Sequence, residues 1–251
     1  MDRMKLSRQK ILELFGNLDS SISVSDPDLQ DIYNGFVFGD VYYQGQLDVK
    51  TRGLITIVIM TTNQTTPQLK EHVAVALRTG ITPVEIKEAI YQCAPYVGFP
   101  KTWNAVQQAN EVFKNNNISL PLETQKQANE NERYDKGLAL QLSLFGDVIT
   151  NMYQNTPANQ KHINTYLSAF CFGDIVSRSG LDIKTRELLT LCILSTLGGC
   201  ENQLRSHVRA NLKAGNDKVT MISSITQSLP YIGFPRMFNA MNCVNEIVPE
   251  K

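Results

Sequence analysis

The chain has 251 residues, of which 42% are hydrophobic and 19% charged, and its 24 basic and 24 acidic side chains cancel. This length is ample for one or two buried cores. A formal charge of zero excludes the basic surface expected of a protein that works on nucleic acid or on anionic lipid. The expected partner is a small neutral or weakly anionic substrate, with no nucleic acid and no membrane.

The first predicted element is a helix over Lys5–Phe15, in which apolar side chains lie among charged ones. Because charges interrupt residues 1–16, this stretch lacks the apolar core of a signal peptide. The most apolar uncharged run, Leu188–Leu197, is about half of the roughly 20 residues that cross a bilayer. We therefore expect a cytoplasmic protein whose residues 1–25 form a helical arm.

Residues 26–114 are predicted to form a first unit, because much of their sequence returns later in the chain. FVFGD at Phe36–Asp40 returns as FCFGD after 134 residues, and LDVKTRGLIT at Leu47–Thr56 returns as LDIKTRELLT at the same spacing. At a spacing of 135 residues, QLKEHV and PYVGFPKTWNA return as QLRSHV and PYIGFPRMFNA. Four blocks in one order indicate a duplication. The second unit then covers residues 136–251, after a polar linker at 115–135.

Both units are predicted to be helical. Thr82 begins a helix with an N-cap, a proline at the first helical position and the capping-box acid Glu85. The apolar runs at 54–60 and 188–197 are short enough to be strands or buried helices by composition. We favour helices, because an aspartate that can serve as an N-cap precedes each run. The predicted fold class is all-α.

The five cysteines form an odd set with no CxxC pair, which disfavours a disulfide framework and fits a reducing cytoplasm. No Cys/His cluster has the spacing of a zinc site, so no metal and no other cofactor is expected. Most of these thiols should be buried fillers. They are Cys93, Cys171, Cys192, Cys200 and Cys243.

Two of the three histidines, His72 and His207, occupy equivalent places in the two units. Such a residue either anchors a helix through hydrogen bonds or takes part in chemistry. In the second unit Cys200, Gln203 and His207 follow at spacings of three and four, which place them on one helix face. A thiol at a helix start is expected to have a lowered pKa. Cys200 and His207 are not expected to touch, because positions i and i+7 of a helix are about 10 Å apart along its axis. Gln203 lies between them and is expected to hydrogen-bond the imidazole.

The candidate chemistry differs between the two units. The first has Gly53 and Thr65 where the second has Glu187 and Cys200. This difference favours one fully equipped site per chain, or a composite site where the units meet. Glu187 is interpreted either as a carboxylate for that site or as the surface partner of Arg186.

Arg186 and its equivalent Arg52 begin the two apolar runs. An arginine here would orient a substrate carboxylate, or would form a salt bridge to Asp182 or Asp48 within one turn. Tyr231 lies in PYIGFP, which reads as a helix interrupted by proline and glycine. Its ring either packs in the core or lines a pocket.

Through these motifs the chain resembles the carboxymuconolactone decarboxylase family, which shares its fold with the AhpD-type alkylhydroperoxidases. The resemblance spans residues 36–113 and 170–248, and LGGCENQLRSHV is similar to the two-unit branch of the family. It implies a tandem duplication of an all-helical domain. It also implies units that oligomerise, typically six around a ring, so two units per chain suggest a homotrimer.

The peroxidase branch of this family has a CxxCxxxH pattern with an upstream glutamate. By resemblance, Cys200 matches the first cysteine, His207 the histidine and Glu187 the relay acid. Gln203 stands where the second cysteine belongs. An oxidised Cys200 would therefore need an external thiol reductant.

The decarboxylase branch usually has a glutamate four residues before the histidine, and a further histidine four residues before the tyrosine of YxGxP. In this chain those places hold Gln68, Gln203, Gln92 and Gln227. The resemblance therefore leaves general acid work to His72 and His207.

Three functions remain open. The first is a carboxy-lyase acting on a small carboxylated lactone, with His207 as general acid and Gln203 polarising a carbonyl. The expected substrate contacts are Arg186, Gln68 and Tyr231. The second is a peroxiredoxin-type antioxidant enzyme, a thiol peroxidase using Cys200. The third is a non-catalytic oligomer that binds a small ligand.

Overall fold

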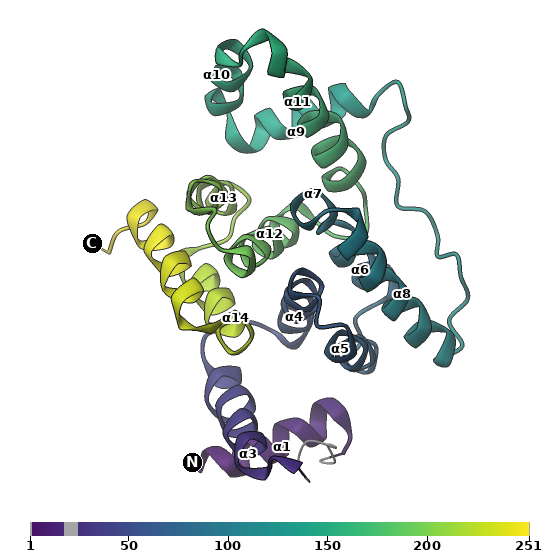
Figure 1. Ribbon diagram of the computed structural model, residues 1–251, viewed down its shortest axis with the longest axis vertical. Coiled ribbons are helices and arrows are strands. Elements are labelled where there is room, and N and C mark those ends of the chain that lie inside the picture. Colours follow the sequence, from purple (N-terminus) through teal and green to yellow (C-terminus); the bar gives the residue numbers. More distant parts are fainter. Residues whose placement is uncertain (1, 18–24, 251) are drawn as a thin grey trace.

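Two apolar helices, α4 (Val49–Asn63) and α12 (Ile183–Leu197), lie at the centre of the computed structural model, which describes residues 2–17 and 25–250 (Figure 1). Each begins at an aspartate, Asp48 or Asp182, whose carboxylate accepts a hydrogen bond from the backbone N–H three residues later. Both helices are buried on nearly all sides. The prediction of buried helices rather than strands is therefore confirmed.

The central helices pack directly against each other, although they come from different units. Burial on both sides explains why their sequences read as apolar runs without a polar stripe. Apolar residues of both units merge here into one cluster. The two units thus share one core.

The helices that follow each central helix surround this pair (Figure 1). In the first unit they are α5 (Thr66–Arg78), α6 (Pro83–Tyr91), α7 (Ala94–Val97) and α8 (Phe99–Asn115); in the second they are α13 (Glu201–Lys213) and α14 (Lys218–Ile247). The predicted capping box at the start of α6 is present. Gly98 separates α7 from α8 with φ 83°, and Gly233 kinks α14 with φ 77°. Both PYxGFP segments are therefore interrupted helices, as predicted.

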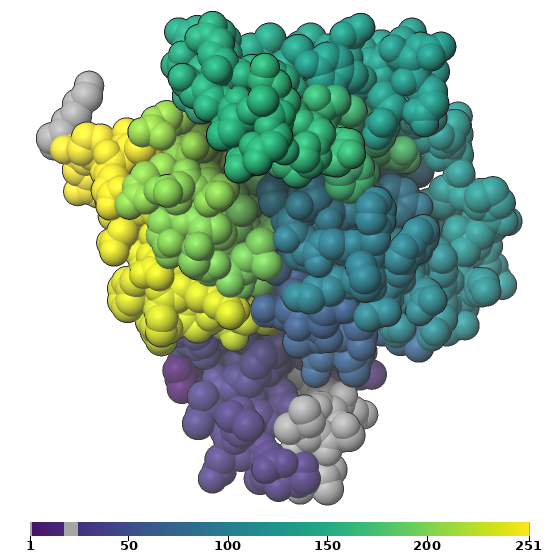
Figure 2. All heavy atoms as spheres, turned by 45° about the horizontal axis from the view of Figure 1, so that its top comes forward, coloured from purple at the N-terminus to yellow at the C-terminus, as the bar shows by residue number. Residues whose placement is uncertain are grey.

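A second set of helices precedes the central helix of each unit. Before α4 lie α1 (Arg3–Phe15), α3 (Pro27–Asn34), the π-helix η1 (Gly35–Asp40) and the 3₁₀ helix η2 (Val41–Tyr43). Before α12 lie α9 (Arg133–Phe145), α10 (Asp147–Asn155), η3 (Ala158–Gln160), α11 (Lys161–Tyr166) and the π-helix η4 (Leu167–Val176). These two sets form opposite ends of the molecule (Figure 2). In the described ranges every regular element is helical.

The helices α1 and α9 occupy equivalent positions. Each starts at an arginine that pairs with the aspartate of an FGD motif, Arg3 with Asp40 and Arg133 with Asp174. The glycine of each motif lets the helices cross closely, since a Cβ there would collide with the arginine carbonyl oxygen. The repeated architecture therefore includes the helix that begins each of these two sets.

The segment from 116 to 132 runs along the surface from α8 to α9 (Figure 1). It is held near the start of α12, where Ser179 donates to the Gln125 carbonyl oxygen at 3.0 Å. Gln127 in turn donates to the Ser179 hydroxyl at 3.1 Å.

Among the helices of residues 2–17 and 25–250, none is both long and apolar enough to span a bilayer.

Candidate active site

A buried pair of side chains joins α12 to α13. The distance from His207 Nδ1 to Glu187 Oε2 is 2.7 Å, and Glu187 is only 2% exposed. Asn211 stabilises the arrangement, because its side-chain amide donates to the backbone carbonyls of both residues. The interpretation of Glu187 as a surface partner of Arg186 is wrong, since α12 has no exposed face at this position.

Two aromatic rings face the His207 imidazole. The ring centroid of Phe145, at the end of α9, lies 5.2 Å away, and that of Tyr96 in α7 lies 6.3 Å away. The Tyr96 hydroxyl is hydrogen-bonded to Thr190 and Cys171, and burial raises the pKa of Tyr96 well above its ordinary value. Tyr96 therefore stays neutral. Since it belongs to the first unit, the arrangement around His207 is composite.

The side chains around His72 in the first unit differ from those around His207. His72 packs between Phe15 and Tyr231, with ring centroids 5.8 and 6.2 Å away. Gly53 stands where the second unit has its carboxylate, and the Ile81 side chain occupies the space that a Cβ there would need. Burial lowers the pKa of His72 to about 4. The adjoining cavity measures about 30 Å³, far below the range of small-molecule sites.

Cys200 lies at the start of α13 and is half-buried. Its thiol donates to the Leu194 carbonyl oxygen at 3.2 Å. Burial raises the pKa of Cys200, and the nearby Glu201 adds to the effect. The expectation of a lowered pKa is wrong, because loss of water and a neighbouring carboxylate outweigh the helix start.

The other four thiols are buried, as expected, and all five are free. No group of three histidine, cysteine or acidic side chains among the described residues is placed to hold a metal ion.

Gln203 and its equivalent Gln68 are both exposed. Gln203 was expected to hydrogen-bond the His207 imidazole, but the Nδ1 atom of that ring is paired with Glu187. Helical spacing sets the direction of a side chain around the axis, but not which part of the helix a neighbour covers. The exposed Gln203 side chain is therefore not the partner of the buried Nδ1 atom.

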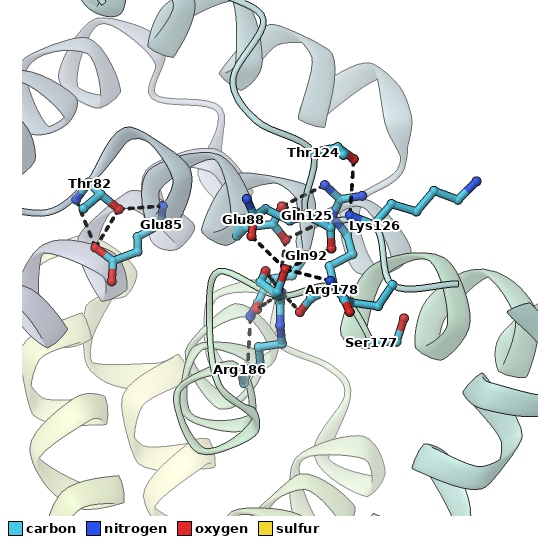
Figure 3. A network of polar contacts seen from close by, with 12 residues as sticks. Thr82, Glu85, Glu88, Gln92, Thr124, Gln125, Lys126, Ser177, Arg178 and Arg186 are labelled. Carbon is cyan, nitrogen blue, oxygen red and sulfur yellow. Dashed lines mark hydrogen bonds and ion pairs between the residues drawn. The ribbon is translucent and has the colours of Figure 1, made fainter. Parts of the chain in front are cut away.

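Arg186 is 1% exposed and donates through Nη2 to Glu88 Oε2 at 2.8 Å. Arg178 donates to the same carboxylate through Nε at 3.0 and 3.1 Å. Figure 3 shows both arginines directed toward Glu88 of α6, with Gln125 beside Arg178. The expected salt bridge to the preceding aspartate is wrong, because that carboxylate caps α12 while the partner acid comes from the other unit.

Arg52 makes the equivalent contact without an acid. Its Nη1 donates to Gln227 Oε1 at 2.6 Å, and its other donors reach the carbonyl oxygens of Gln44 and Leu47. Asp48 caps α4 instead of pairing with it. At the position equivalent to Glu88 of α6 the second unit has Ser223.

Sequence reasoning missed Glu88 and Phe145. Glu88 belongs to no repeated motif, because the second unit has no acidic residue at the equivalent position. Phe145 had a usable signal, since it ends α9 as Phe15 ends α1, 130 residues earlier. Tyr231, an expected substrate contact, lies at His72 and not at His207.

Known decarboxylases are similar in sequence to parts of this chain. A 4-carboxymuconolactone decarboxylase of Acinetobacter baylyi is 33% identical over 130 residues, which are 49% of this chain and 96% of that protein. A nitrosuccinic acid decarboxylase of Metarhizium robertsii is 30% identical over 77 residues, which are 31% of this chain and 54% of that protein.

A crystal structure from Burkholderia xenovorans LB400, described as a gamma-carboxymuconolactone decarboxylase subunit, has a TM-score of 0.58 at 19% identity and covers 94% of both chains, which shows a shared fold. The family model for carboxymuconolactone decarboxylases matches residues 27–111 and 162–246, once in each repeat. The predicted all-α tandem repeat is confirmed, and the chain belongs to the carboxymuconolactone decarboxylase family.

Proposed function

We propose that this protein is a carboxy-lyase acting on a small carboxylated lactone or a related compound, with its reaction at His207. The observation that carries the proposal is the buried 2.7 Å contact between His207 and Glu187, which only one repeat contains. Two similar proteins are named as decarboxylases, one of 4-carboxymuconolactone and one of nitrosuccinic acid.

The reaction needs one proton at carbon. When the carbon–carbon bond to the carboxylate breaks, CO₂ leaves and the electron pair moves into the conjugated carbonyl of the lactone. Protonated His207 then delivers its Nε2 proton to carbon, and solvent restores that proton. Glu187 accepts the Nδ1 hydrogen throughout and so holds the ring in one orientation. The sum is one proton consumed and one CO₂ released.

The surroundings of His207 suit a ring-shaped substrate. Phe145 packs on Phe172 and on the imidazole, and these rings adjoin an apolar cluster that includes Val176. A substrate ring would take the place of the Phe145 ring and lie next to Tyr96. Apolar walls favour the loss of a charged carboxylate as neutral CO₂.

Some roles expected from the sequence are not part of this proposal. Gln203 and Gln68 are exposed, and Arg186 is committed to a buried carboxylate. Tyr231 contacts the imidazole of His72, where no acidic residue equivalent to Glu187 is present.

The test is CO₂ release from 4-carboxymuconolactone by purified wild-type protein and three variants. His207→Ala should lower kcat by about 10²- to 10⁴-fold, the range of general acid catalysis. Glu187→Gln should lower it by about ten-fold or more, because a neutral amide orients the imidazole less firmly. His72→Ala is the matched control and should retain activity. Equal losses in His72→Ala and His207→Ala would contradict the proposal.

The geometry favours this lyase over the thiol peroxidase. A peroxidatic cysteine needs a thiolate, and Cys200 has a raised pKa and a thiol directed to a backbone carbonyl. Its Sγ is not part of the pair formed by His207 and Glu187.

We propose further that the chain forms a homotrimer with six units in a ring. Phe99 and Trp103 are 51% and 59% exposed in the first unit, and the equivalent Phe234 and Phe238 are 54% and 56% exposed in the second. Large apolar side chains exposed at equivalent positions of a duplicated unit suit an interface repeated around a ring.

A further inference from the structure

A second cavity lies away from His207, between α6, α8 and the segment that follows α8. Its volume is about 500 Å³, within the range of small-molecule sites. Leu120 and Leu122 of the segment form one wall, and Val106 of α8 forms part of another. None of the residues that surround the His207 imidazole lines it.

Lys87 places a cation in this cavity. It is 7% exposed, and its Nζ lies 5.7 Å from the ring centroid of Tyr91 and 6.0 Å from that of Phe113. Burial alone lowers the pKa of Lys87, and no carboxylate in the described part of the chain forms an ion pair with it. A buried ammonium without a counter-charge is unfavourable unless a partner is supplied.

The acidic groups of the lining do not fill that role. Glu88 is already shared by Arg178 and Arg186 at 2.8 to 3.1 Å, and Glu123 is exposed on the linker. The Asn110 side-chain oxygen is also buried in the cavity wall without a hydrogen-bond partner. The cavity therefore combines an unpaired cation and an unused acceptor with apolar walls.

The duplication supplies an internal comparison. In the second unit the places of Lys87 and Tyr91 hold Ile222 and Thr226. The covering segment also occurs once, between the units. The Lys87 cation and the Tyr91 ring are thus features of the first unit alone, whereas Asn110 recurs in the second unit as Asn245.

We propose that this cavity binds a small organic carboxylate with an apolar ring and a hydroxyl group. The carboxylate pairs with the Lys87 ammonium, the ring packs between the leucines and Tyr91, and the hydroxyl donates to the Asn110 side-chain oxygen. This site is separate from the proposed lyase centre and does not depend on its activity.

The test is isothermal titration calorimetry with 3-hydroxybenzoate, benzoate and the uncharged isostere 3-hydroxybenzamide. Wild-type protein should bind one 3-hydroxybenzoate per chain. The amide should bind at least about ten-fold more weakly, because it offers no charge to Lys87. Benzoate should bind about five-fold more weakly, because it lacks the hydroxyl donor.

Variants locate the binding. Lys87→Met should weaken 3-hydroxybenzoate binding at least about ten-fold without a lower melting temperature, because it removes an unpaired buried charge. Lys70→Met, on the exposed surface of α5, is the matched control and should bind as wild type. His207→Ala should also bind as wild type, which separates this cavity from the lyase site.

The proposal is overturned if wild-type protein shows no saturable binding, or if the amide binds as tightly as the carboxylate. It is also overturned if His207→Ala loses binding that Lys87→Met retains. The ligand comparison uses only wild-type protein, so the result does not depend on the folding of any variant.

Discussion

The ring of Tyr96 lies edge-on to the imidazole of His207, with centroids 6.3 Å apart, although the two residues belong to different repeats. His72 and Tyr231 form the reciprocal pair at 6.2 Å. The PYxGFP tyrosine of each unit therefore packs against the histidine of the other unit, so that one chain contains two related histidine sites. Only the place at His207 also contains a carboxylate.

Tyr96→Leu should lower decarboxylase kcat by about ten-fold or more, since the ring helps to fix the imidazole. Tyr96→Phe should restore most of the activity, because it keeps the ring. Tyr231→Leu is the matched control and should change kcat less than about two-fold. The measurement is steady-state CO₂ release, and equal effects of the two leucine variants would contradict a single working site.

Cys200→Ser should leave decarboxylation within about two-fold of wild type, because the thiol contacts the α12 backbone and not the imidazole. Treatment of wild-type protein with peroxide and dimedone, followed by mass spectrometry, should show little sulfenic acid at this thiol because its pKa is raised. Rapid and selective labelling of Cys200 would instead support the thiol peroxidase.

Glu88→Gln should lower the free energy of unfolding by about 3–5 kcal/mol, because Arg186 would be left buried without its carboxylate. The control is Glu111→Gln, which breaks an exposed ion pair with Lys70 and should cost less than about 1 kcal/mol. Urea unfolding measures both. Similar small losses would show that the buried network contributes little to joining the units.

Acid should destabilise the protein through His72. Burial lowers its folded-state pKa to about 4, below the value of about 6.5 expected in the unfolded chain. Between these values the unfolded chain binds more protons, so stability falls as the pH falls and levels off below about pH 4.

Urea unfolding at pH 7 and at pH 4.5 measures how much the free energy of unfolding falls between these pH values. This fall should be about 2 kcal/mol larger for wild type than for His72→Phe. His162→Gln, at an exposed position on α11, controls for the loss of a histidine. An unchanged pH dependence in His72→Phe would contradict this assignment.

Light scattering after size-exclusion chromatography should give the mass of three chains. Trp103→Glu and Phe238→Glu should each shift the protein toward monomer, because a charge would be buried in the ring contact. Exposed Val148 on α10 is the control position, and Val148→Glu should remain trimeric. A monomeric wild type would contradict the proposed ring.

Repetition in the sequence determined much of this fold. Matching motifs predicted two like units, and the aspartates ahead of α4 and α12 predicted where the central helices begin. Capping and apolar patterns act over a few residues, so one sequence is enough to read them. The same local comparison showed that Glu187 has no counterpart at Gly53.

Only the tertiary structure decided which partners those residues have. Glu187 pairs with His207 and not with its neighbour Arg186, and Arg186 reaches Glu88, 98 residues away. Cys200 lies beside the α12 backbone, where burial reverses the expected direction of its pKa. Burial and long-range pairing depend on how helices from both units pack together, and short-range spacing carries no information about that packing.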